Sequence, residues 1–99
     1  MKQTMTINET VDNYTYITMT DERYKVSADY IITQYNDDDD ISYSAECDGI
    51  DGFDNDYIVM CHTDIYSADG FDTMDQAMAD VIYHFYRLVK NYNEGWLNI

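Results

Sequence analysis

Residues 73–92 read TMDQAMADVIYHFYRLVKNY and carry the strongest helical pattern in this chain. Thr73 and Gln76 fit a capping box, in which the threonine caps the helix start and the glutamine side chain reaches back. Apolar residues then recur at spacings of three and four and form one stripe, namely Met74, Ala77, Met78, Val81, Phe85, Leu88 and Tyr92. The pattern predicts a C-terminal helix that ends at Asn93 to Gly95 and packs on the rest of the protein along one face.

Four segments before this helix are predicted to be strands. Asn13–Thr20 is rich in β-branched and aromatic residues. Tyr24–Tyr35 alternates with period two, which places one set of side chains inward: Tyr24, Val26, Ala28, Tyr30 and Ile32. Ile41–Cys47 alternates in the same way, with Ile41, Tyr43, Ala45 and Cys47 inward. Tyr57–Tyr66 is mostly apolar and is predicted to be a central fourth strand.

The remaining segments are predicted to be irregular. Residues 1–12 are polar and are expected to form a loose N-terminal arm, while Asn36–Asp40 and Asp48–Asp56 are expected to be loops. The tetrapeptide Asp-Gly-Phe-Asp at 51–54 and 69–72 is interpreted as turn chemistry rather than as a repeat. Short connections favour a meander. The sequence therefore predicts one domain over residues 1–99 with an α+β fold, an antiparallel sheet of about four strands followed by one C-terminal helix packed on one face. Since one helix cannot cover both faces, the other face is expected to be polar or part of an interface.

The charge of the chain is strongly one-sided. Between Val26 and Tyr86 there is no lysine or arginine, and this stretch carries fifteen aspartates and glutamates. The net charge of −15 on 99 residues exceeds the roughly 2–8 units that keep a small domain soluble, and it costs self-repulsion in the folded state. With 45% hydrophobic residues and eleven tyrosines, the chain still has enough apolar material to fold. Such a charge suggests a positively charged partner.

The main hypothesis for the acidic surface is phosphate mimicry, in which carboxylates occupy the arginines and lysines of a nucleic-acid-binding protein. Tyrosine suits such an interface because it is common in interaction hot spots and stacks with arginine. A purely solvated acidic surface is the competing interpretation. The candidate partner-binding residues are Asp37, Asp38, Asp39, Asp40, Glu46, Asp48, Asp51, Asp54, Asp56, Asp69, Asp72, Asp75, Asp80 and Tyr83.

Other kinds of site have weaker support in the sequence. The aspartates between Asp48 and Asp56 could form an irregular calcium site, although no segment has the EF-hand order of ligands. Cys47 and Cys61 are predicted to be buried structural cysteines, because Cys61 and His62 would point to opposite faces of a strand. His84 is predicted to lie on the helix surface. No nucleotide loop, GxSxG or HExxH motif occurs, so no catalytic residue, metal or cofactor is predicted, and an enzyme is not expected.

The chain has no apolar run of about 18 residues and no apolar segment near its N-terminus, which predicts a cytoplasmic protein without a membrane span. Its negative charge would repel anionic membranes and free nucleic acid. The apolar tail of Trp96, Leu97 and Ile99 and the uncovered sheet face are compatible with a homodimer.

In size and charge the chain resembles the small acidic inhibitors that phages and mobile elements encode, among them anti-CRISPR and anti-restriction proteins that imitate DNA. The resemblance covers the composition of the whole chain and involves no diagnostic motif, so no family residue is carried over. It implies an inhibitor that occupies the DNA- or guide-binding groove of a host defence complex. Two alternatives remain open: an immunity protein or antitoxin that neutralises a basic toxin, and a calcium-responsive acidic module.

Overall fold

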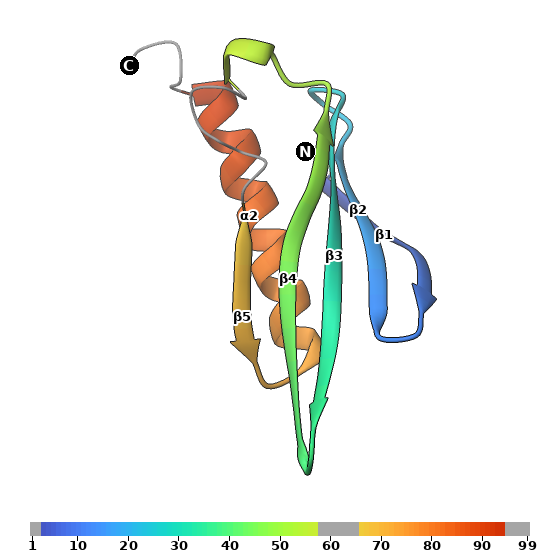
Figure 1. Ribbon diagram of the computed structural model, residues 1–99. Coiled ribbons are helices and arrows are strands. Elements are labelled where there is room, and N and C mark those ends of the chain that lie inside the picture. The colour runs from blue at the N-terminus through green and yellow to red at the C-terminus, as the bar shows by residue number, and fades with distance from the viewer. Residues whose placement is uncertain (1–2, 58–65, 95–99) are drawn as a thin grey trace.

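The computed structural model describes residues 3–57 and 66–94, which form a five-stranded antiparallel sheet with one long helix lying across one face (Figure 1). The strands follow one another in space in chain order, so the sheet is a meander. The elements are β1 (Gln3–Val11), β2 (Tyr14–Asp21), β3 (Val26–Asp37), β4 (Asp40–Asp51), β5 (Ser67–Phe71) and α2 (Met74–Glu94). The predicted α+β class and the C-terminal helix on one face are confirmed, with five strands in place of about four.

The predicted loose N-terminal arm is wrong, because residues 3–11 form the edge strand β1. This strand pairs with β2 from Gln3 opposite Asp21 to Val11 opposite Tyr14, with a register shift between Ile7 and Glu9. Most of its side chains are exposed. An edge strand that buries little can be almost entirely polar, and the threonines of β1 retain good strand propensity. Its polarity therefore indicated exposure and not disorder.

The central strands match their predicted cores. Val26, Ala28, Tyr30 and Ile32 of β3 are all buried under the helix. Ile41 was predicted to face inward but is 52% exposed, because it lies near the end of the β3–β4 hairpin. Strand β4 also continues past Cys47 to Asp51, where a loop was predicted. Asp29 pairs with Gly49 while Tyr30 pairs with Cys47, so β4 holds one extra residue there, and a glycine inside a strand commonly marks such a bulge.

The predicted fourth strand, Tyr57–Tyr66, falls mostly outside the described residues. Its first residue, Tyr57, belongs to a helical turn at residues 55–57 and is buried. The last strand described is β5, which pairs antiparallel with β4 through Ala68 and Phe71. Strand β5 contains most of the second Asp-Gly-Phe-Asp segment, so the interpretation of that copy as a turn is wrong.

The first Asp-Gly-Phe-Asp copy does turn the chain at the end of β4. Gly52 has φ +87°, and a Cβ atom at this position would lie 2.5 Å from the carbonyl oxygen of Lys25. Any residue other than glycine would be strained at this position, because of both the positive φ and the close approach of the β2–β3 connection. The glycine allows Phe53 to turn back into the core, where it is buried.

Helix α2 begins as predicted. The backbone N–H of Gln76 donates to Thr73 Oγ1 at 3.1 Å, and the Gln76 side-chain oxygen accepts from the Asp72 N–H at 2.8 Å, one residue before the cap. The apolar stripe contacts the sheet, with Ala77, Val81 and Phe85 fully buried and Met74, Met78 and Tyr92 packed at its margins. Within the described residues, neither helical segment combines the length and apolarity that a membrane-crossing helix needs.

Candidate functional site

The β3–β4 hairpin extends beyond the other strands and ends in the four consecutive aspartates Asp37–Asp40 (Figure 1). Asp37 pairs with Asp40, so only Asp38 and Asp39 form the turn. Asp38 has φ 54°, a left-handed conformation that aspartate tolerates better than most residues. All four side chains are exposed. The hairpin therefore concentrates four negative charges at its tip.

The sheet face opposite α2 is mostly polar, as expected from the single helical stripe, although Val11 and Ile31 also lie on it. Cross-strand pairs on this face join hydroxyls, tyrosines and carboxylates, as in Thr33 with Ser44 and Tyr35 with Ser42. None of the five described strands contains a lysine or an arginine. This face is called the open face below, and its polar side chains include Thr4, Thr6, Tyr16, Thr18, Ser27, Asp29, Thr33, Tyr35, Ser42, Ser44, Glu46 and Ser67.

A hydrogen-bonded row crosses three strands of the open face. Asn8 on β1 donates through Nδ2 to Thr18 Oγ1 on β2 at 2.7 Å, and Thr18 Oγ1 donates to Asp29 Oδ1 on β3, also at 2.7 Å. This row fixes the orientation of the exposed Asp29 carboxylate. Asp29 was not among the candidate residues from the sequence, although its position on the polar side of a predicted strand was a usable signal.

A groove lies on the open face where β4 meets β5. It encloses about 450 Å³ and is lined in part by Tyr35, Ser44, Glu46, Ser67 and Asp69. Glu46 on β4 lies opposite Ser67 on β5, two residues before Asp69. Two predicted partner-binding residues, Glu46 and Asp69, therefore border one cavity. The Ser44 hydroxyl lies 3.5 Å from Tyr35 Oη, at the limit of a hydrogen bond.

The other predicted acidic residues are spread along the molecule rather than gathered in one patch. Asp48, Asp51, Asp54 and Asp56 are exposed in and after the end of β4 that is remote from the hairpin tip. Asp54 Oδ1 accepts from the Asp56 N–H at 2.9 Å, a local turn contact of the kind aspartate commonly makes. Asp72 and Asp75 are exposed at the start of α2. The negative charge therefore extends over both ends of the sheet.

Two candidate residues on α2 lie away from the open face. Tyr83 is 58% exposed, as expected, and the Arg87 guanidinium carbon lies 5.7 Å from its ring centroid. Asp80 is only partly buried and its carboxylate accepts a hydrogen bond from the Tyr66 hydroxyl. Asp80 therefore already has a partner within the protein, unlike a carboxylate that simply faces solvent.

His84 is not the surface histidine that was predicted. Its Nδ1 is hydrogen-bonded to Tyr30 Oη at 2.7 Å, and its ring stacks on Tyr66 with centroids 4.1 Å apart. Burial lowers the pKa of His84, and the nearby Asp80 carboxylate partly opposes this effect. Burial is also the largest of the causes that raise the pKa values of Tyr30 and Tyr66. A neutral imidazole and a protonated phenol fit one arrangement, in which the Tyr30 hydroxyl donates to Nδ1.

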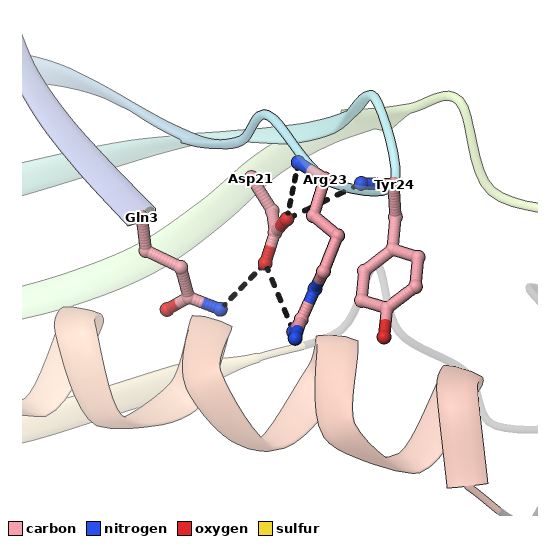
Figure 2. A network of polar contacts seen from close by, with 4 residues as sticks. All are labelled: Gln3, Asp21, Arg23 and Tyr24. Atoms are coloured by element: carbon pink, nitrogen blue, oxygen red, sulfur yellow. Dashed lines mark hydrogen bonds and ion pairs between the residues drawn. The ribbon is translucent and has the colours of Figure 1, made fainter. Parts of the chain in front are cut away.

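The buried Asp21 anchors the connection between β2 and β3 (Figure 2). Its Oδ1 accepts from the backbone N–H groups of Arg23 at 2.9 Å and Tyr24 at 3.3 Å, and its Oδ2 accepts from Gln3 Nε2 at 3.1 Å. The Arg23 guanidinium lies 3.9 Å from Oδ2. This is the single ion pair within residues 3–57 and 66–94. Sequence reasoning missed the network, although an aspartate whose side chain bonds to the backbone two residues on is a common turn device.

Metal and thiol chemistry have little geometric support in the part of the chain that the structure describes. No three histidine, cysteine, aspartate or glutamate side chains there come close enough together to bind a metal ion. Cys47 is buried, as predicted, and its thiol donates to the Gly49 carbonyl at 3.6 Å. The predictions for Cys61 and His62 lie outside the described residues.

Comparison of the chain with protein-family models, with curated proteins and with solved structures gave no significant match.

Proposed function

We propose that this protein is an acidic inhibitor that imitates nucleic-acid phosphates and blocks the DNA- or guide-binding surface of a host defence complex. One observation carries the proposal. The exposed aspartates and glutamates between Val26 and Tyr86 make no ion pair within the described residues, where the single pair joins Arg23 to Asp21. Their charge is therefore left for an external cation to neutralise.

The density of this charge supports the proposal. The protein is 48 Å long in its longest dimension and carries a net charge of −15. This corresponds to roughly one negative charge per 3 Å of length, about half the density of duplex DNA, which carries one charge per roughly 1.7 Å of its axis. A basic groove that attracts nucleic acid would attract this surface by the same long-range forces.

The protein is proposed to act by binding and not by catalysis. The group of side chains most suited to proton transfer, Tyr30, Tyr66, Asp80 and His84, is partly or fully buried between the sheet and α2, with hydrogen bonds inside the group. Within residues 3–57 and 66–94, no histidine contacts the exposed carboxylates of the open face and the hairpin tip, because His84 lies against Tyr30 and Tyr66. A binding role in the cytoplasm of a host cell, against a basic nucleic-acid-binding protein, is consistent with these features.

The test is an affinity capture from bacterial lysate at low salt, followed by elution with duplex DNA and then with a salt gradient. Purified defence complexes that were captured would next be assayed for DNA binding with and without the protein. A DNA-binding defence protein released by duplex DNA, and inhibited in return, is the expected result. A basic toxin released by salt but not by DNA would replace the proposal with an immunity function. The absence of any salt-sensitive partner would refute both.

A further inference from the structure

The open face of the sheet lacks a covering layer in the described residues, because α2 lies on the other side (Figure 1). A groove between β4 and β5, with a volume of about 450 Å³, lies on this face. Pockets of roughly 300–1,000 Å³ are large enough to hold a small ligand or a long side chain. The groove is formed by paired strands, so the backbone that carries its lining residues is in place before any ligand arrives.

The charge of the groove is uncompensated. Glu46 and Asp69 line it and both are exposed. None of the described strands supplies a lysine or arginine. The described lysines and arginines lie elsewhere, namely Arg23 and Lys25 in the β2–β3 connection and Arg87 and Lys90 on α2, which covers the opposite face. An anion would be repelled here, while a cation would be attracted by the two carboxylates.

The uncharged side chains of the groove favour one kind of cation. Serine hydroxyls at positions 42, 44 and 67 add hydrogen-bond acceptors beside the two carboxylates. Tyr35, which is 52% exposed, also lines the groove. A guanidinium group has five donors in a planar fork and can stack on an aromatic ring, whereas an ammonium group is a compact point charge with three donors. The lining therefore matches arginine better than lysine.

We propose that this groove is the docking site for an arginine side chain on the basic protein partner, with Glu46 and Asp69 pairing with the guanidinium and Tyr35 stacking on it. This inference rests on the proposed function and locates its main contact on the open face rather than at the hairpin tip. Long-range attraction then comes from all the acidic residues, while the groove supplies the preference for arginine.

The test is a titration of the full-length ¹⁵N-labelled protein, at low salt, with a capped tetra-arginine peptide and with a capped tetra-lysine peptide. We expect amide shifts concentrated at residues 42–46 and 67–70, and at least threefold tighter binding of the arginine peptide. Glu46→Gln combined with Asp69→Asn is expected to weaken arginine binding at least fivefold. Tyr35→Leu is expected to remove most of the preference for arginine over lysine.

The control is Asp38→Asn combined with Asp39→Asn, which removes the same charge from the hairpin tip. Asparagine also tolerates the left-handed conformation of Asp38. This variant is expected to weaken arginine binding less than twofold. Equal losses in the two double variants, or shifts confined to residues 36–41, would overturn the groove while leaving an electrostatic inhibitor intact. If neither peptide binds the wild-type protein, both the groove and the proposed function fail. The amide spectrum of each variant shows whether it is folded, and the shift map of the wild-type protein tests the groove independently of any substitution.

Discussion

Asp21→Ala is expected to be among the most destabilising single substitutions at a polar residue in this protein. The change removes the acceptor for three hydrogen bonds, from Arg23 N–H, Tyr24 N–H and Gln3 Nε2 (Figure 2). Hydrogen bonds to charged groups contribute about 1.5–3 kcal/mol each, and a buried donor left unsatisfied costs about 1–3 kcal/mol. Some of these donors can turn to water, because Arg23 is exposed and Tyr24 and Gln3 are only partly buried. The expected loss is therefore about 3 kcal/mol.

Two further variants separate the carboxylate from its ion pair. Asp21→Asn keeps one oxygen for the backbone N–H groups and should cost about 1 kcal/mol. Arg23→Gln removes an ion pair of 3.9 Å whose arginine is 44% exposed, together with a cation–π contact to Tyr24. Exposed pairs contribute only about 0–1 kcal/mol, so this loss should be the smallest of the three.

Urea unfolding followed by far-ultraviolet circular dichroism would measure all three variants. For a domain of this size a loss of 3 kcal/mol corresponds to a fall in Tm of roughly 12–24 °C. Asp21→Ala should reduce the midpoint concentration without changing the slope of the transition. If Asp21→Ala were no more destabilising than Arg23→Gln, the hydrogen-bond network would not be the source of stability at this turn.

Three other perturbations have defined outcomes. The pKa of His84 is lowered in the folded protein, so the unfolded chain takes up a proton first as the pH falls. Stability should therefore be complete above about pH 7 and should decline as the pH falls through 6.5 toward the folded pKa. Thermal melts of the wild-type protein and of His84→Phe should show a weaker pH dependence in the variant. Gly52→Ala should cost about 2 kcal/mol or more, because of the positive φ and the approach to the Lys25 carbonyl, and a denaturant titration showing no loss would contradict the described turn. Changing all four residues Asp37–Asp40 to asparagine should leave Tm unchanged or raise it, because like-charge repulsion is relieved. The same change should slow association with the basic partner at low salt, measured by stopped flow. An unaltered association rate would exclude the hairpin tip from electrostatic steering.

Local patterns predicted the elements that bury much apolar surface. The stripe of α2 and the inward set of β3 follow from periodicities of 3.6 and 2, which exist in the chain before any tertiary contact forms. The two edge strands were missed for one shared reason. Strand β1 leaves most of its side chains exposed, and β5 contains an Asp-Gly pair, so neither has a strong hydrophobic pattern. Their pairing with β2 and β4 comes from backbone hydrogen bonds that the side-chain pattern does not record.

In the candidate site, too, the sequence predicted residue types, while tertiary contacts decided the surroundings of each residue. The list of acidic residues could be written from the sequence, but the list alone could not distinguish Asp80, which accepts a hydrogen bond from Tyr66, from Asp69, which borders the groove. His84 looked like a surface residue because it lies beside the apolar helical stripe. It is partly buried because Tyr30 and Tyr66 approach it from the sheet side of the fold.

The sequence by itself determined the sign and excess of the charge, the absence of lysine and arginine between Val26 and Tyr86, and the helix at the C-terminus. Net charge is a sum over residues and a helical stripe is a local repeat, so neither depends on how distant segments meet. Only the tertiary structure decided that Asp21 is buried and that Glu46 and Asp69 share one groove. Those facts depend on strand order and register, because a shift of one residue would turn every side chain of a strand to the other face of the sheet.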